Sequence, residues 1–196
     1  MQGESRARSK NPPKSEPGPA PFLPALPGSF FERPAEDVAL GLLGKALVRR
    51  RGRRLQAYII TETEAYVGPE DLACHAARGR TKRNEIMFGR AGTFYVYLIY
   101  GMHWMLNVVT GEVGYPAAVL LRGAEMIDGP GRLTKALGVT SSFNGKQAVE
   151  RTGLWFADLG QALRPDEILR TARIGVDYAG PIWSAKEYRF LLKQRG

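Results

Sequence analysis

Two short segments of this chain hold most of the side chains that could do chemistry. In the first, Glu62, Glu64 and Tyr66 alternate along the sequence, and His75 follows shortly after them. Residues spaced by two share one face of a β-strand, so the two carboxylates and the tyrosine would point the same way. One carboxylate of such a group could position and deprotonate a water molecule as a general base. A solvent-exposed strand face would show the same spacing, so this pattern alone leaves both interpretations open.

The second segment is rich in tyrosine and ends in a turn. Tyr95 and Tyr97 share a strand face, whereas Tyr100 has the other parity or lies in the turn that Gly101 predicts. Aromatic residues are favoured in strands, so the tyrosines could equally be core residues. An aromatic side chain and Met102 on a protruding turn would, however, suit a wedge between base pairs. Together the two segments indicate a site that holds a flat ring beside a carboxylate.

The composition narrows the class of protein. A chain of 196 residues can form one domain with a substantial core. Its 28 lysines and arginines against 19 acidic residues give a formal charge of +9, which is typical of a protein with a polyanionic partner such as nucleic acid. The single cysteine, Cys74, excludes an intrachain disulfide, and two histidines make a zinc site improbable. No apolar run reaches the roughly 18 residues of a membrane span, so we expect a soluble, intracellular protein.

Residues 1–26 are rich in proline, glycine and basic residues, and we expect a flexible arm there, ahead of a folded domain over 27–196. The expected helices cover 34–43 and 129–137, with a short helix or turn over 84–88. The expected strands cover 46–50, 55–66, 93–100, 104–109, 117–126, 154–157, 173–176 and 188–192. Strands outnumber helices and short turns join several neighbours. This predicts a single α+β domain built on a mainly antiparallel, curved sheet flanked by short helices.

Motifs spread along most of the chain match one known family. They are ETEAYxGPED from Glu62, ACHA from Ala73, Arg83-Asn84, Met87-Phe88, GTFYVYLIYGM from Gly92, Leu106-Asn107-Val108, AVLLR from Ala118, GPGRLTKAL from Gly129 and RIGV from Arg173. In this order and with this spacing, the chain resembles the alkyladenine (3-methyladenine) DNA glycosylase family over about residues 27–194. These are monofunctional purine DNA glycosylases of base excision repair.

The resemblance implies an enzyme that flips an alkylated or deaminated purine out of duplex DNA and hydrolyses its N-glycosidic bond. Matching positions make Glu64 the base that activates water. They make Arg122 the residue that holds this water or a nearby phosphate, and its apolar strand offers it no other obvious partner. Tyr66 and His75 would stack on one face of the purine and Tyr97 on the other. An alkylated, cationic purine would stack particularly well between tyrosines through cation–π attraction.

The resemblance also assigns roles around the purine. Asn107 would reject normal guanine through a polar clash with its exocyclic amine. Tyr100, at the tip of a hairpin protruding toward DNA, would fill the gap left in the duplex, with Met102 and His103 beside it in the minor groove. No lysine matches the nucleophile of strand-cleaving glycosylases, so the product would be an abasic site, formed without a metal or cofactor.

Several properties of such an enzyme stay open on the sequence. The substrates could be 3-methyladenine, 7-methylguanine, hypoxanthine or ethenoadenine in double-stranded DNA. We expect a monomer that binds no membrane. We expect it in a bacterial cytoplasm or nucleoid, with a nuclear location left open.

Two other functions stay open on the residues alone. A metal-dependent nuclease could use Glu62, Glu64, Asp71 and His75 as ligands for magnesium or manganese. A non-catalytic nucleic-acid-binding module would use its aromatic residues to stack bases and its basic residues to hold phosphate. A metal requirement would favour the nuclease, and full activity of a Glu64→Gln variant would favour the binding module.

Overall fold

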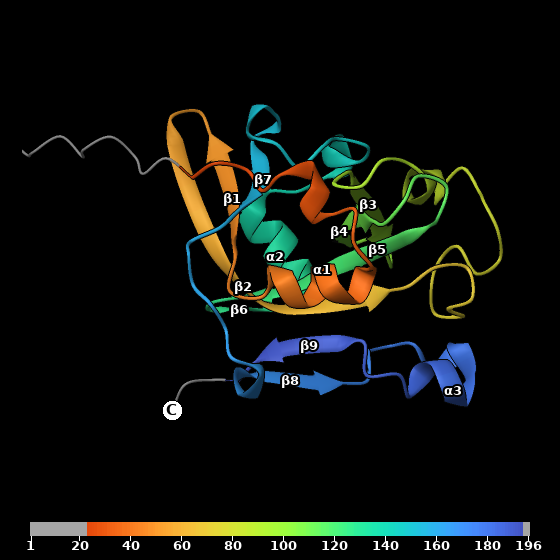
Figure 1. Ribbon diagram of the computed structural model, residues 1–196. Coiled ribbons are helices and arrows are strands. Elements are labelled where there is room, and N and C mark those ends of the chain that lie inside the picture. Colours follow the sequence, from red (N-terminus) through yellow and green to blue (C-terminus); the bar gives the residue numbers. More distant parts are fainter. Residues whose placement is uncertain (1–22, 194–196) are drawn as a thin grey trace, which may run out of the picture.

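The computed structural model describes residues 23–193, which form an open sheet with short helices packed around it (Figure 1). Every strand pairing in this range is antiparallel. The α+β class and the mainly antiparallel sheet that the sequence predicts are therefore confirmed. The strands are β1 Ala46–Arg51, β2 Arg54–Tyr66, β3 Phe94–Ile99, β4 His103–Thr110, β5 Ala117–Ala124, β6 Ile127–Asp128, β7 Leu154–Ala157, β8 Ile168–Thr171 and β9 Arg189–Leu192.

The helices of the described chain are short. They are α1 Ala35–Leu42, α2 Pro130–Leu137 and α3 Gly180–Ser184, with 3-10 turns at Gly28–Phe30, Glu85–Phe88, Ser141–Phe143, Glu150–Thr152, Pro165–Glu167 and Asp177–Ala179. The longest, α1 and α2, have eight residues each, and nothing within residues 23–193 qualifies as a membrane-spanning helix.

Strand β2 organises the sheet. Its 13 residues pair with β1 along the first half and with β5 and β9 along the second. The pairing with β5 shifts register between Ile60 and Thr63, which marks a β-bulge. A bulge adds an unpaired residue and bends the strand. It therefore accounts for the bend in Figure 1, where β2 leaves the β1–β2 hairpin and runs on beneath α1.

Alternate residues of the central strands face two different environments. On β5, Leu121 belongs to the core cluster that includes α1 and α2, whereas the next residue, Arg122, lines a pocket on the other side. On β2, the hydroxyl of Thr63 donates to the Ala39 carbonyl of α1 at 3.0 Å, so Glu64 points away from that helix. Burying each large apolar side chain contributes about 1.5–3 kcal/mol. The apolar face thus fixes the register, and the register fixes which side chains reach the pocket.

One expected strand is absent. Residues 173–176 form a bend rather than a strand, and Gly175 within it has a φ of +74°. The Ile174 N–H there donates to the Glu64 carboxylate at 2.8 Å, which takes this group out of any strand ladder. The other expected strands and both expected helices are confirmed, whereas β8, β6 and α3 had not been anticipated.

Residues 23–26 belong to the expected flexible arm, yet they pack on the domain. The Trp155 indole N–H donates to the Leu23 carbonyl at 2.7 Å, and the Leu26 N–H donates to the Phe156 carbonyl at 2.7 Å. Packing therefore extends at least to Leu23, ahead of the expected boundary at residue 26. The rest of the arm, residues 1–22, lies outside the described residues, so its flexibility stays a prediction.

Candidate active site

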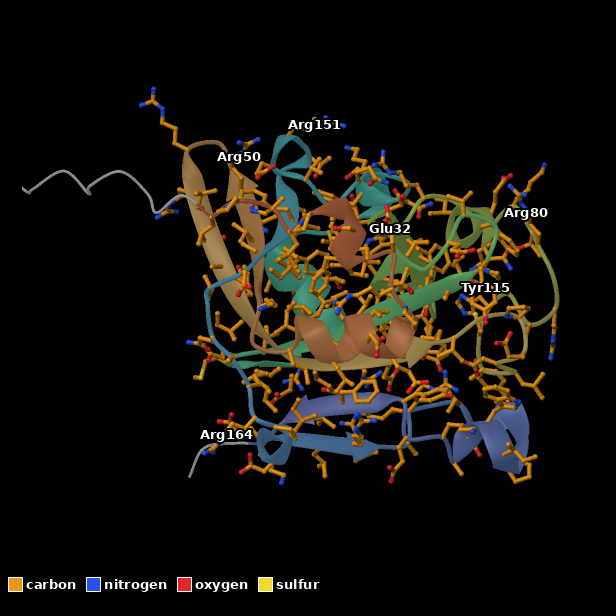
Figure 2. All side chains as sticks on the ribbon, in the orientation of Figure 1. Glu32, Arg50, Arg80, Tyr115, Arg151 and Arg164 are labelled. Carbon is orange, nitrogen blue, oxygen red and sulfur yellow. The ribbon has the colours of Figure 1, made fainter. Side chains whose placement is uncertain are left out.

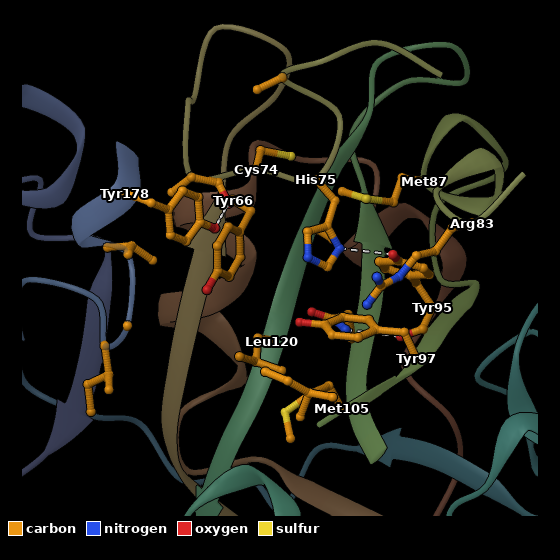
Figure 3. A pocket seen from close by; sticks show the side chains of 18 of the residues that line it. Tyr66, Cys74, His75, Arg83, Met87, Tyr95, Tyr97, Met105, Leu120 and Tyr178 are labelled. Carbon is orange, nitrogen blue, oxygen red and sulfur yellow. Dashed lines mark hydrogen bonds between the residues drawn. The ribbon is translucent and has the colours of Figure 1, made fainter. Parts of the chain in front are cut away.

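A pocket of about 720 Å³ lies on the sheet face that points away from α1 (Figure 3). It brings together six of the residues that the sequence singled out, namely Tyr66, His75, Tyr97, Tyr100, Asn107 and Arg122. Glu64 lies beneath the lining, fully buried and hydrogen-bonded to the Tyr66 hydroxyl. Met102 and His103 lie on the neighbouring hairpin, outside the lining.

Sheet register arranges the floor of this pocket. Tyr95 of β3 pairs with Asn107 of β4, Asn107 pairs with Leu120 of β5, and Leu120 pairs with Glu64 of β2. Directly paired residues have Cβ atoms about 4.5–5.5 Å apart, so four strands contribute one continuous row. The amide of Asn107 donates to the Tyr95 carbonyl at 3.0 Å, which fixes the side chain and leaves its oxygen for the pocket. The site thus spans the sheet rather than one loop.

Glu64 has the surroundings of a general base. One carboxylate oxygen accepts the Ile174 N–H at 2.8 Å, and the other accepts the Tyr66 hydroxyl at 3.0 Å. The Arg122 guanidinium lies 3.4 Å from the carboxylate. Burial raises the pKa of Glu64, and it outweighs the opposing effects of Arg122 and the two hydrogen bonds. A buried carboxylate with raised proton affinity, beside a pocket, can take a proton from water.

Arg122 has a closer partner than Glu64. Its Nε donates to Glu62 at 2.8 Å, and the same Glu62 oxygen accepts a bond from Arg189 at 2.6 Å. A Cβ atom at Gly123 would lie 3.2 Å from Glu62 Cβ, so the missing side chain there leaves room for this ion pair. The expectation that Arg122 lacks an obvious partner is therefore wrong. The long-range partner could not be seen in an apolar strand pattern.

Hydrogen bonds from the Asn84 side chain hold the loop that carries His75. The buried side chain of Asn84 donates to the carbonyls of His75 and Gly79, both at 2.9 Å. The His75 Nδ1 lies 2.9 Å from the Tyr95 hydroxyl, as the dashed line in Figure 3 marks. Burial, and secondarily the nearby Arg83, lower the pKa of His75 and so favour its neutral form. Tyr95 and Asn84 are site residues to which the sequence analysis gave no role.

Aromatic rings surround the opening. The centroids of His75 and Tyr97 are 4.7 Å apart, and those of Tyr95 and Tyr97 are 5.2 Å apart. Tyr66 lies across the opening from this cluster, as Figure 3 shows. Tyr178, another residue without an assigned role, lines the rim and donates its hydroxyl to the Ala73 carbonyl at 2.9 Å. Such a cluster offers flat, apolar faces to a planar ring.

The β3–β4 hairpin ends in an exposed tip. Tyr100 is 82% exposed and Met102 is 71% exposed. The Met102 N–H donates to the Ile99 carbonyl at 3.1 Å, and both residues between them, Tyr100 and Gly101, have positive φ angles. For a tyrosine this left-handed backbone is strained, a feature often found at functional sites. His103 is also exposed, but its ring lies close to Gly131 at the start of α2.

A buried ion pair supports the wall behind Tyr66. The side chains of Asp71 and Arg173 are both fully buried. The Arg173 guanidinium donates two hydrogen bonds to the Asp71 carboxylate, at 2.5 and 2.8 Å. Asp71 also accepts the N–H groups of Val67 and Ala73 at 3.2 and 3.0 Å. The Arg173 guanidinium lies 4.8 Å from the centroid of the Tyr66 ring. The sequence placed Asp71 among metal ligands and Arg173 in a strand, and neither assignment holds.

The ligand set of the nuclease hypothesis does not form. Glu62 is paired with two arginines, Asp71 with Arg173, and His75 with the Tyr95 hydroxyl. Among residues 23–193, no three histidine, cysteine or acidic side chains are arranged to hold a metal ion. The four proposed ligands are therefore not gathered into one metal site, and this hypothesis is wrong about its site.

Comparisons with known proteins match the geometry. The family model described as Methylpurine-DNA glycosylase (MPG) matches residues 29–129 and 124–196. A protein of Myxococcus xanthus is 48% identical over 181 residues, which cover 86% of this chain and 90% of the relative. One of Methanocella arvoryzae is 44% identical over 178 residues, which cover 81% of this chain and 88% of the relative. Both are named "Putative 3-methyladenine DNA glycosylase". The chain therefore belongs to the methylpurine-DNA glycosylase family, a family of DNA repair enzymes.

Proposed function

We propose that this protein excises alkylated or deaminated purines from double-stranded DNA as a monofunctional glycosylase. The observation that carries the proposal is the buried Glu64 carboxylate, with its raised pKa, next to a pocket walled by aromatic rings. The names of the relatives support methylated adenine as one substrate. The net charge of +9 supports a nucleic-acid partner, and the enzyme would therefore work wherever the cell holds its DNA.

The chemistry follows from the placement of these groups. A purine flipped out of the duplex would enter the pocket and stack between Tyr66 and Tyr97, at about 1–3 kcal/mol per stacked base. As the N-glycosidic bond breaks, its electron pair leaves with the purine and the sugar becomes oxocarbenium-like. Glu64 would stabilise this cation and take a proton from the water whose oxygen bonds to C1′. The products are the free base and an abasic site.

Two further features support this scheme. No lysine lines the pocket within the described residues, so a Schiff-base step that would cut the strand has no nucleophile there. The exposed Tyr100 and Met102 on the hairpin tip can enter the duplex and replace the flipped nucleotide. The Asn107 amide donates to the Tyr95 carbonyl, and its rejection of unmodified guanine stays a prediction.

The direct test is a single-turnover assay in EDTA on duplexes with one hypoxanthine, one ethenoadenine or one 7-methylguanine. Free base and strand breaks are measured before and after alkali, for the wild type and for Glu64→Gln. We expect the wild type alone to release base, with breaks only after alkali. Breaks without alkali would contradict the monofunctional scheme. Binding without release by the wild type would instead indicate a non-catalytic module.

A further inference from the structure

The pocket surface carries positive charge without an exposed negative charge. Its charged lining residues within the described chain are Arg78, Arg83 and Arg122. The nearest carboxylate, Glu64, is fully buried below the lining and lies 3.4 Å from Arg122. A bound purine that carries a positive charge would therefore meet like charges along the wall.

Arg83 is the cation that lies closest to the aromatic cluster. Its guanidinium is 5.1 Å from the centroid of the Tyr97 ring, and Figure 3 shows Arg83 on the same side of the pocket as Tyr95 and Tyr97. No carboxylate in residues 23–193 forms an ion pair with it, since the neighbouring Glu85 pairs with Arg80 at 2.9 Å. Arg83 therefore presents a guanidinium without a carboxylate partner to this side of the pocket.

The opposite wall of the pocket, formed by Tyr66, also has a guanidinium behind it, but a carboxylate neutralises that charge. Arg173 lies 4.8 Å from the Tyr66 centroid and is paired with Asp71 in a fully buried ion pair. The two rings that would hold the purine thus each have an arginine against them. A cation already on a tyrosine ring competes with a cationic ligand for the attraction of that ring. Of these two arginines Arg83 alone has no carboxylate partner among the described residues, so its charge is the one that a cationic purine between the rings would feel most.

The same residue favours a neutral ligand in a second way. Arg83 disfavours protonation of His75, whose Nδ1 lies 2.9 Å from the Tyr95 hydroxyl. When that hydroxyl donates to Nδ1, the proton of the neutral ring is on Nε2. His75 then offers one hydrogen-bond donor and no net charge to the bound ring, which suits a neutral purine with ring-nitrogen or carbonyl acceptors.

We propose that Arg83 is a specificity-determining residue that penalises cationic purines and so directs this pocket towards neutral modified purines. This inference rests on the proposed glycosylase function. It reverses the simpler expectation that stacking tyrosines select cationic, alkylated purines. Hypoxanthine and ethenoadenine belong to the favoured neutral class, and 7-methylguanine belongs to the cationic class.

The test compares single-turnover rates at saturating enzyme on matched duplexes that contain hypoxanthine, ethenoadenine or 7-methylguanine. The variants are Arg83→Gln, which removes the charge, and Arg83→Lys, which keeps it. Arg53→Gln is the control, because it removes the same charge from the exposed tip between β1 and β2, at the other end of β2 from Tyr66. Arg83 is itself exposed, so its replacement should leave the fold intact.

We expect Arg83→Gln to raise the 7-methylguanine rate relative to the hypoxanthine rate by about tenfold, the size expected for one partly solvated charge at contact distance. Arg83→Lys and Arg53→Gln should keep the wild-type ratio. Equal slowing on all three duplexes, with weaker binding to undamaged DNA, would make Arg83 a phosphate contact and overturn the inference. An unchanged ratio with normal rates would overturn it as well. If the wild type released no base from any duplex, the proposed function would fail instead.

Discussion

Two buried carboxylates lie near Tyr66, and they differ in how fully hydrogen bonds and an arginine compensate their charge. Asp71 and Glu64 are both fully buried. Asp71 accepts two backbone N–H groups and a bidentate arginine, with its shortest contact at 2.5 Å. Glu64 accepts one backbone N–H and one phenol, and its arginine lies 3.4 Å away, more tightly bonded to another residue.

The difference shows that burial alone does not give a carboxylate its role. Four hydrogen bonds, two of them from a guanidinium, hold the Asp71 charge and fix the loop that leads to His75, as expected for a structural pair. Glu64 is left with fewer and weaker bonds, so the cost of burying its charge is not fully offset and its pKa rises. One region is therefore built for stability and the other for proton transfer, and five experiments test this difference.

The largest effect should come from Glu64→Gln. Losing the general base should lower the single-turnover rate by about 10²–10⁴-fold. Because burial of this charge works against folding, the variant should unfold at the same temperature as the wild type or higher. Base release and thermal unfolding, followed side by side, check both expectations. A marked loss of stability would mean that Glu64 is structural, like Asp71.

Asp71→Asn should have the opposite profile. It leaves the buried Arg173 charge without its partner, which typically costs about 3–5 kcal/mol of unfolding free energy. Urea denaturation measures this loss. Glu85→Gln is the control, because it breaks the exposed pair with Arg80 and should cost less than about 1 kcal/mol. If both variants lost the same small amount, the claim that the Asp71 pair locks the loop would be refuted.

The fall in reaction rate on the acid side of the pH profile should follow the protonation of Glu64. Its pKa lies above the ordinary 4.5, so the rate should fall by about tenfold per pH unit below that raised value, as the base becomes protonated. The measurement is the single-turnover rate on the hypoxanthine duplex against pH. A flat profile from neutral pH down to about 4.5 would contradict a raised pKa.

The same pKa predicts how stability depends on pH. A carboxyl group whose pKa is higher in the folded state favours folding fully below its unfolded value of about 4.5. This contribution is lost as the pH rises through the folded value. The stability advantage of Glu64→Gln over the wild type should therefore be largest near neutral pH and should shrink towards pH 4.5. Denaturation curves of both proteins at two pH values test the sign.

The smallest effect should come from Glu62→Gln. Without the Glu62 charge, Arg122 is free to move onto Glu64, which should lower the pKa of Glu64 and weaken it as a base. We expect a rate loss of about tenfold or less and an acid limb displaced to lower pH. Glu112→Gln, at an exposed position between β4 and β5, is the matched charge control. An unchanged acid limb would show that Glu62 does not keep Arg122 away from Glu64.

Local periodicity and turn signals could be read from the order of residues alone. Alternation along 55–66 placed Glu64 and Tyr66 on one strand face, and Gly101 placed Tyr100 at a hairpin tip. The excess of strands over helices and the short turns between them predicted an antiparallel α+β domain, and its central strands were found close to their expected bounds. These features follow from backbone geometry within a few residues, which the order of side chains encodes directly.

Which charged groups meet depends on the fold as a whole. Ile174 donates to Glu64 across 110 positions of sequence, and Arg173 meets Asp71 across 102. Arg83 reaches Tyr97 only because the intervening loop is folded back by Asn84. Residue spacing carries no information about such partners, since the fold brings them together through the packing of distant strands. The sequence therefore identified the candidate base, whereas its burial in the fold raised its proton affinity and the surrounding arginines set the charge of its pocket.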